Sequence, residues 1–348
     1  MKRILSCMLS LIVLCLSGCG VVQPIQESTR PFTDSLGREV EVPVDIQRIA
    51  VTGLTGQLTL FALCPDRLAG LADGWRVTAA DYLDEAYLSL PVLGQLYGGK
   101  GDLNPETLLQ SGAQLILDIG EAKADMVGEL DALQAQTGLS CVHIDASLST
   151  IGSTYRMLGD LLDLPVESET LATYCETTYA KACALASGVD KIRALYVLGD
   201  AGLNVLAKDS YHSQAFDLLC DNLAVLEIPS ARGIGSEVSL EQILLWDPDY
   251  IVFAPGSIYA RVADDPTWQT LTAISAGRYC QVPDGPYNWM GFPPGAQRLL
   301  GMLWLGKVLY GNAAAYDLYT ETAAFYRLFY HCELSQAQFD VLTAHSHF

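Results

Sequence analysis

Positively charged residues are scarce in this sequence. Lys and Arg together number 20 against 40 Asp and Glu, which gives a formal net charge of −20 at pH 7 over 348 residues. Because nucleic-acid binding depends on clustered Lys and Arg that neutralise phosphates, this balance argues against a nucleic-acid partner. Hydrophobic residues make up 50% of the chain, which excludes a disordered protein, and the length suffices for two domains of ordinary size.

Histidine is also sparse, with five residues in the whole chain. His143, His212 and His331 are scattered, so the sequence does not indicate a His-rich manganese or zinc site. His345 and His347 form a His-x-His pair, but they lie at a C-terminal end that we expect to fray. A metal site there is the less favoured alternative, and we predict neither a resident metal nor a cofactor.

Cysteine pairs of the Cys-x-x-Cys type are absent. Seven cysteines follow Cys19 at irregular spacing, and their number is odd. Cys175 and Cys183 are two helical turns apart in the helix that we expect there, which is too far for a disulfide between them. We therefore expect mostly free thiols, of which those in apolar surroundings pack as small core residues.

The N-terminal segment has no hydrophobic run long enough to span a bilayer. Two basic residues precede an apolar run over residues 4–16, a pattern typical of an export signal. The run ends in Leu16-Ser17-Gly18-Cys19, which resembles the bacterial lipoprotein signal. The resemblance implies a signal peptide over 1–18, diacylglycerol on the Cys19 thiol and a lipidated, unstructured tether over 19–31. An ordinary secretory signal with a chance cysteine is the alternative.

The longest helical pattern lies in the middle of the chain, over residues 165–188. Pro165 suits the first helical position, and apolar residues recur at i, i+4 spacing along the segment. We expect a helix of about 22 residues, roughly 33 Å long, that ends at a left-handed Gly188. We interpret it as a rigid spine between an N-terminal lobe (32–164) and a C-terminal lobe (189–348). One more surface helix in a single sheet is the alternative.

Short apolar strands alternate with helical patterns on both sides of this helix. In the N-terminal lobe we expect strands at 48–52, 68–72, 91–94, 113–118 and 141–144. In the C-terminal lobe we expect them at 193–198, 250–254 and 279–282. This alternation implies mainly parallel sheets with helices on both faces. The predicted fold class is α/β, with two lobes.

One segment of each lobe matches a segment of the other. Residues 104–117 and 239–252 align without a gap, and Glu106 then stands opposite Glu241. Each glutamate lies in the first turn of a short predicted helix, where a carboxylate can cap the helix or favour its dipole. Two equivalent lobes facing each other across a cleft would account for the repeat.

Four motifs occur in chain order: Thr33-Asp34-Ser35-Leu36-Gly37-Arg38, Ser239-Leu240-Glu241-Gln242, Asp265-Pro266-Thr267-Trp268 and Arg298-Leu299-Leu300-Gly301. Together they resemble the iron/cobalamin family of substrate-binding proteins that serve ABC importers, over roughly residues 32–310. This resemblance implies the class III periplasmic-binding-protein architecture, in which one long rigid helix joins two α/β lobes. It also implies a ligand that is a ferric siderophore, haem or corrinoid, or in some branches molybdate or tungstate.

The resemblance assigns roles to individual residues. Glu106 and Glu241 match the acidic residues that pair with arginines of the permease dimer. The ligand is expected between the lobes, at the loops that follow the strands. Aromatic side chains there would contact a macrocycle or a catecholate, and cations would neutralise an anionic complex. The candidates are Trp75, Arg76, Tyr97, Lys100, Tyr211, His212, Arg232 and Trp289, with the Thr52-Gly53-Leu54-Thr55 loop, Glu121, Asn288 and Met290 beside them.

The predicted function is an extracytoplasmic substrate-binding lipoprotein, monomeric and anchored to the membrane, that delivers an iron complex or corrinoid to an ABC permease and its ATPase. A molybdate- or tungstate-type oxyanion is the alternative ligand, although Gly291 and Phe292 stand where some family members carry an Asp-Arg pair. Residues 94–100 fit a phosphate-loop pattern, but Gly101 replaces the required Ser or Thr, so nucleotide binding is set aside. An exported α/β enzyme would need a His or Cys of perturbed pKa between the lobes, and we predict no enzymatic activity.

Overall fold

The first ordered element is a two-stranded hairpin. A computed structural model describes residues 28–97, 101–228, 230 and 234–348. Strands β1 (Thr29–Thr33) and β2 (Glu39–Pro43) pair antiparallel across a turn in which Gly37 takes the left-handed φ of 78°. Because β1 begins at Thr29, the last residues of the expected tether are paired in a strand, and the lobe starts earlier than residue 32.

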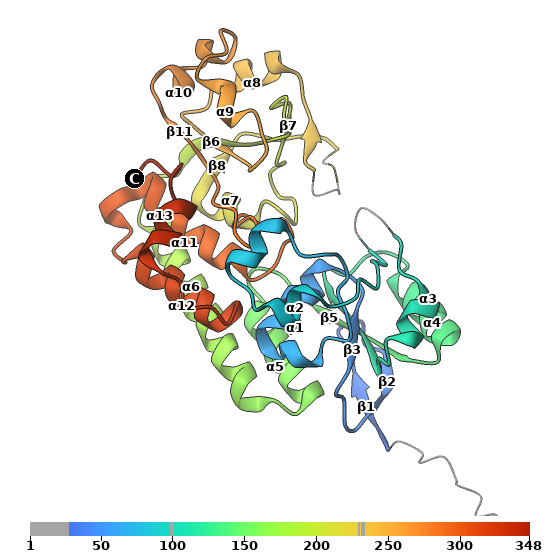
Figure 1. The fold of residues 1–348 in the computed structure, drawn as a ribbon. Coiled ribbons are helices and arrows are strands. Elements are labelled where there is room, and N and C mark those ends of the chain that lie inside the picture. Colours follow the sequence, from blue (N-terminus) through green and yellow to red (C-terminus); the bar gives the residue numbers. More distant parts are fainter. Residues whose placement is uncertain (1–27, 98–100, 229, 231–233) are drawn as a thin grey trace, which may run out of the picture.

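The N-terminal lobe is built on a parallel sheet in the order β3-β4-β5. Leu115 and Leu117 of β4 share a core with Phe61 and Leu158, whereas Ile116 packs on the opposite face. Helices therefore cover both faces, as predicted (Figure 1). The elements are β3 (Ile49–Val51), α1 (Leu54–Leu63), η1 (Pro65–Arg67), η2 (Val77–Asp81), α2 (Glu85–Leu88), α3 (Pro105–Gln110), β4 (Leu115–Gly120), α4 (Met126–Thr137), β5 (Ser140–Asp145) and α5 (Ile151–Leu162).

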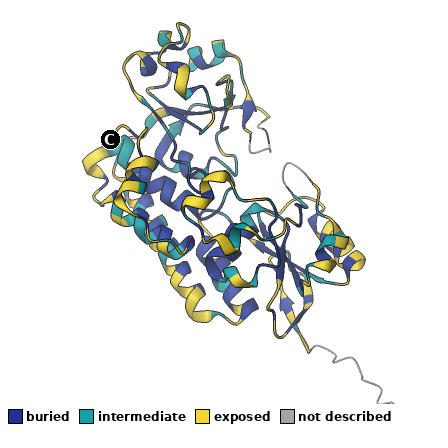
Figure 2. Cartoon of the chain, in the orientation of Figure 1, coloured by how far each residue is buried: buried dark blue, intermediate teal, exposed yellow. Residues whose placement is uncertain are grey.

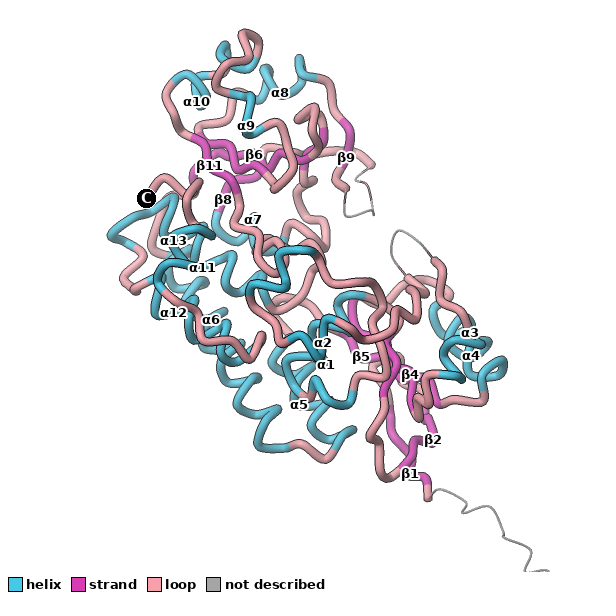
Figure 3. The backbone as a smooth tube through the Cα atoms, viewed as in Figure 1, coloured by secondary structure: helices cyan, strands magenta, loops and turns pink. Residues whose placement is uncertain are grey.

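Two strands expected in this lobe do not form. Residues 68–72 and 91–94 contribute only single bridges, between Ile49 and Leu68 and between Leu71 and Val92. Both segments are apolar enough for a sheet, but each makes too few backbone hydrogen bonds for a ladder. The N-terminal sheet therefore has three strands instead of the five expected (Figure 3).

The spine helix is α6 (Pro165–Ser187), with 23 residues and Pro165 in its first turn. Its apolar face is buried at Leu171, Cys175 and Ala182. These boundaries match the prediction, but the ending differs: Gly188 has φ −99°, outside the left-handed region. Helices α5 and α6 pack so closely that Gly159 has no room for a side chain against Ser168.

The C-terminal lobe contains a six-stranded mixed sheet in the order β11-β10-β6-β7-β9, with β8 also pairing with β6. Strands β11, β10, β6 and β8 run parallel, and β7 is antiparallel to both β6 and β9. The short strands β7, β8 and β9 were not predicted. The elements are β6 (Ile192–Leu198), β7 (Asn204–Val205), α7 (Gln214–Leu219), β8 (Cys220–Asn222), β9 (Ser236–Glu237), α8 (Leu240–Trp246), β10 (Tyr250–Phe253), α9 (Tyr259–Val262), η3 (Trp268–Thr270), α10 (Thr272–Ser275) and β11 (Tyr279–Gln281).

The C-terminal segment returns to the spine and the N-terminal lobe. It comprises α11 (Gln297–Tyr310), η4 (Gly311–Ala313), α12 (Leu318–Phe329) and α13 (Gln336–Leu342). One continuous core joins Leu117 of the first sheet, Leu171 of α6, Tyr196 of the second sheet and Phe325 of α12 (Figure 2). None of the helices within the described residues is both long and apolar enough to cross a bilayer.

The end of the chain is ordered, which corrects the expected fraying. Beyond α13, the Gln281 amide of β11 donates to the His345 carbonyl at 3.0 Å. The Trp304 indole nitrogen of α11 donates to Ser346 Oγ at 2.8 Å. The seven cysteines of the described residues are all free, as predicted, and Cys141, Cys175, Cys220 and Cys280 are buried.

Gly159→Ala tests whether close α5–α6 packing holds the spine. A Cβ at this position would lie 2.0 Å from Ser168 Oγ, so we expect a loss of about 1–3 kcal/mol in unfolding free energy. Gly128→Ala in α4 is the matched control, because no atom lies within 4 Å of its Cβ position, and it should gain about 0.5–1 kcal/mol. Chemical denaturation of both variants measures the difference. Equal effects would contradict the packing account.

Candidate functional site

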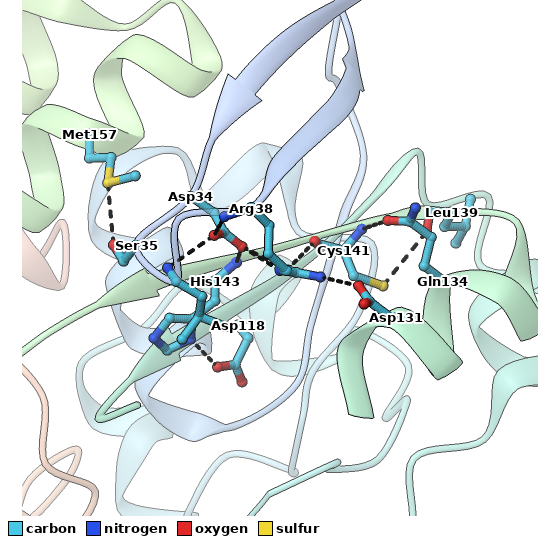
Figure 4. A network of polar contacts seen from close by, with 11 residues as sticks. Asp34, Ser35, Arg38, Asp118, Asp131, Gln134, Leu139, Cys141, His143 and Met157 are labelled. Carbon is cyan, nitrogen blue, oxygen red and sulfur yellow. Dashed lines mark hydrogen bonds and ion pairs between the residues drawn. The ribbon is translucent and has the colours of Figure 1, made fainter. Parts of the chain in front are cut away.

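The Asp34 motif (residues 33–38) links the N-terminal hairpin to the first sheet by hydrogen bonds. The Asp34 carboxylate accepts from the Arg38 backbone at 3.0 Å and from Arg38 Nη2 at 2.7 Å (Figure 4). Arg38 also donates to the Cys141 carbonyl of β5 at 2.8 Å and to Asp131 of α4 at 2.9 Å. The His143 amide donates to Asp34 at 3.3 Å. This part of the Asp34 motif therefore has a structural role.

A second buried polar group holds the loop that follows β3. Asp118 and His143 are register partners on β4 and β5, and His143 Nδ1 lies 2.6 Å from Asp118 Oδ2. The Thr52 hydroxyl donates to the other Asp118 oxygen. His143 is fully buried, and its Nε2 has no hydrogen-bond partner among the described residues. Asp118 was missed as a candidate, although a carboxylate inside an apolar strand was a visible signal. It fixes the Thr52 loop expected to line the ligand site.

Trp75 and Arg76 lie where the N-terminal lobe meets the C-terminal lobe. Arg76 Nη1 lies 2.5 Å from Asp284 Oδ1, with side-chain exposures of 47% and 26%. The ring centroids of Trp75 and Tyr287 lie 6.0 Å apart, and Tyr287 belongs to the same loop as Asp284. The Trp75 indole nitrogen donates to the Tyr87 carbonyl at 3.0 Å. Burial raises the pKa of Asp284, and the Arg76 charge opposes that shift. These two predicted site residues therefore contact the loop after β11.

Tyr211 and His212 form a second meeting point of the lobes. The Tyr211 hydroxyl donates to the Ala146 carbonyl at 2.5 Å, at the end of β5. The His212 ring stacks on Phe292 with centroids 5.2 Å apart and planes 5° apart. Burial lowers the pKa of His212, and the Arg298 charge adds to this. Aromatic side chains of the C-terminal lobe thus lie beside the end of β5.

Arg298 is buried beneath Tyr211 and holds its backbone in place. It is 1% exposed, and its Nη1 donates to the Tyr211 carbonyl at 2.9 Å and to Gln214 Oε1 at 3.1 Å. The same Gln214 oxygen accepts from the Leu148 amide of the other lobe at 3.1 Å. Burial lowers the pKa of Arg298, and the charge of Glu121, after β4, opposes that shift. The sequence analysis used Arg298 only as a motif, because spacing cannot show this contact.

Gly291 is required for the position of Arg298. It has φ 108°, and a Cβ there would lie 2.8 Å from Arg298 Cδ. Among the described residues, Arg298 Nε has no hydrogen-bond partner. The loop that contains Gly291 and Phe292 therefore lies directly against Arg298.

The remaining candidates divide into three groups. Tyr97 is half-buried, and Lys123 Nζ lies 4.0 Å from its ring centroid. Trp289 is a correction: it is fully buried in the core, with its ring 6.5 Å from Tyr326, so it presents no surface to a ligand in this structure. The neighbouring Asn288 and Met290 are buried too. The last group, Lys100, Arg232 and the lipidation candidate Cys19, lies outside the described residues.

Glu106 and Glu241 are exposed in the first turns of α3 and α8. The helix ends are capped by other side chains, because Asn104 accepts from the Glu106 amide and Ser239 accepts from the Gln242 amide. Each short helix precedes a central strand of its lobe, β4 or β10, so the internal repeat is present in the structure. Neither glutamate is needed as a side-chain cap.

The structure resembles solved solute-binding proteins. An ABC transporter solute-binding protein from Sulfurospirillum deleyianum DSM 6946 matches with a TM-score of 0.83 and 23% identity, over 90% of this chain and 99% of that chain. A periplasmic solute-binding protein from Veillonella parvula DSM 2008 matches with 0.76 and 21%, over 92% and 98%. The molybdate-bound MolA of Haemophilus influenzae matches with 0.70 and 19%, over 88% and 99%.

The chain has the fold of the ABC-importer solute-binding proteins. This confirms the predicted α/β class. No protein-family model and no curated protein sequence matches the chain. The solute-binding proteins that share this fold are transport proteins and not enzymes. Within the residues described, no group of three or more His, Cys, Asp or Glu could hold a metal ion.

The His212 ring gives a pH-dependent prediction. Its pKa is lowered in the folded protein, so the unfolded chain takes up a proton first as the pH falls below about 6.5. Unfolding free energy is therefore lost as the pH falls, and His212→Gln should lose less between pH 7.5 and 5.5. Denaturant titrations at both values measure this. If His212→Gln instead lowers the unfolding free energy by the same amount at both pH values, the protonation of His212 plays no part, and the variant has lost only the stack on Phe292.

Proposed function

We propose that this protein is the extracytoplasmic substrate-binding component of an ABC importer and that it carries an iron complex or a corrinoid between its lobes. The observation that carries the proposal is the meeting of aromatic and charged side chains from both lobes at the strand ends. Trp75 and Arg76 face the loop after β11, and Tyr211 meets the end of β5. Ligands of open α/β sheets bind at such strand ends.

The chemistry of these side chains supports a flat or catecholate-bearing metal complex. Trp75, Tyr97 and Tyr211 offer aromatic surface, and Arg76 offers a half-exposed cation whose carboxylate partner a ligand can replace. Lys100 and Arg232 remain proposed ligand contacts from the sequence. A periplasmic haem-binding protein of Roseiflexus sp. RS-1 has the same fold, with a TM-score of 0.55 and 18% identity.

An oxyanion is the second candidate ligand, and one observation favours it. The guanidinium of Arg298 is buried behind Gly291 and Tyr211, and its Nε has no hydrogen-bond partner among the described residues. A buried cation is costly unless each of its donors is paired, and a bound oxyanion near Nε would offset that cost. MolA, which has the same fold, was solved with molybdate bound.

The proposed partners are a permease dimer with its ATPase and the membrane surface. Glu106 and Glu241 are exposed on equivalent helices of the two lobes, where they suit pairing with permease arginines. The sequence around Cys19 supports a lipid anchor, so we place the protein outside the cytoplasmic membrane as a monomer.

A thermal-shift screen tests the function. The probes are haemin, a ferric catecholate siderophore, cobalamin and molybdate, and a ligand at a hundred times its Kd stabilises the folded state by about 2.7 kcal/mol. We expect one of the four to raise the melting temperature. Arg76→Gln should reduce that rise for an anionic probe, whereas Arg278→Gln, an exposed residue before β11, serves as the charge-matched control. No rise with any probe would contradict the proposed ligand classes.

Charge reversal tests the docking role separately. Glu106→Arg with Glu241→Arg should nearly abolish uptake in cells, because like charges would then face each other, while the ligand Kd measured by calorimetry stays within about twofold. Glu167→Arg with Asp190→Arg, exposed near the two ends of α6, gives the same charge change and should leave uptake unchanged. Normal uptake with the first pair reversed would remove the docking role. Loss of ligand affinity would instead place both glutamates at the ligand.

A further inference from the structure

The C-terminal residues after α13 are held in place by two other elements of the C-terminal lobe. The Gln281 amide of β11 donates to the His345 carbonyl, and the Trp304 indole of α11 donates to Ser346 Oγ. Ser346 is fully buried. The chain end therefore lies in a fixed position against this lobe (Figure 1).

The two histidines of the His-x-His pair face the same neighbour. Ser346 points inward, whereas His345 and His347 on either side of it are exposed. The His345 ring centroid lies 5.2 Å from that of Tyr259, and His347 Nε2 lies 3.1 Å from the Tyr259 hydroxyl. Two exposed imidazoles thus contact one tyrosine of α9.

We propose that His345 and His347 form a binding site for a single transition-metal ion of the nickel, copper or zinc class. Neutral imidazole is a preferred ligand of these ions, and the affinity of such sites rises towards copper. Because no carboxylate or thiolate completes a three-residue group among the described residues, water fills the other coordination positions, and calcium and magnesium are excluded.

Tyr259 positions one of the two ligands. The Tyr259 hydroxyl lies 3.1 Å from His347 Nε2 and can accept a hydrogen bond from its N–H. The Nδ1 lone pair of His347 is then free for the metal. A ligating histidine whose other ring nitrogen donates to a neighbour is the usual arrangement in metal sites.

This site goes beyond the proposed ligand site and is independent of it. Its residues contact Tyr259 of α9 and Tyr279 of β11, and none of them takes part in the contacts between the lobes described above. Binding there requires no movement of either lobe.

Calorimetry with Ni²⁺ on the full chain, purified without a histidine tag, tests the proposal. We expect one ion per chain, and His345→Ala or His347→Ala should each weaken binding by about tenfold or more. Tyr259→Phe should weaken it by about tenfold while leaving both ligands present. His331→Ala removes an exposed histidine elsewhere and should leave the Ni²⁺ affinity unchanged.

Two results would overturn the proposed metal site. No Ni²⁺ binding by the unaltered chain, or equal binding by the His345→Ala/His347→Ala double variant, would overturn the site and leave both rings as packing against Tyr259. Because both side chains are exposed, the variants should melt at the unaltered temperature without metal. A melting scan before the titration therefore separates loss of a ligand from loss of the fold.

Discussion

The structure depends on one hydrophobic core that runs without interruption from lobe to lobe. Side chains of α6 such as Leu171 and Cys175 belong to the same cluster as Leu117 of the first sheet and Tyr196 of the second. Each such aliphatic or aromatic side chain contributes about 1.5–3 kcal/mol when fully buried. An ordinary linker would leave the lobes free to rotate, whereas this shared core fixes the distance and angle between them.

The polar contacts between the lobes rely on that fixed geometry. An ion pair between Arg76 and Asp284, both partly exposed, contributes little stability by itself. Its position is set because Tyr287 of the same loop packs near Trp75. Likewise, Tyr211 reaches the end of β5 because Arg298 holds its carbonyl from the buried side. The candidate ligand site is therefore assembled by packing, and its charges are left available for a ligand.

Local sequence patterns predicted the elements that are decided locally. The spine was predicted correctly because Pro165 and the apolar face of α6 are sufficient signals. Residues 68–72 failed as a strand because sheet pairing depends on partners distant in the chain, and only single bridges formed.

The site could be predicted only in part, because its members meet through long-range contacts. Arg76 and Asp284 are 208 positions apart, and nothing in their spacing indicates the pair. Trp289 was assigned to the ligand because the sequence does not show whether an aromatic residue in a loop is exposed or buried. In the structure it is buried in the core. The ordered His345 depends on a hydrogen bond from β11, which the sequence does not show.

The central claim is that a ligand binds between two lobes held in a fixed relation. Amide hydrogen exchange with and without the stabilising ligand measures it most directly, residue by residue. Binding should slow exchange on both sides of the boundary, near Arg76 and near Tyr211, and leave α3, α8 and the buried face of α6 unchanged. Protection confined to one lobe, or a change along the whole of α6, would contradict the account.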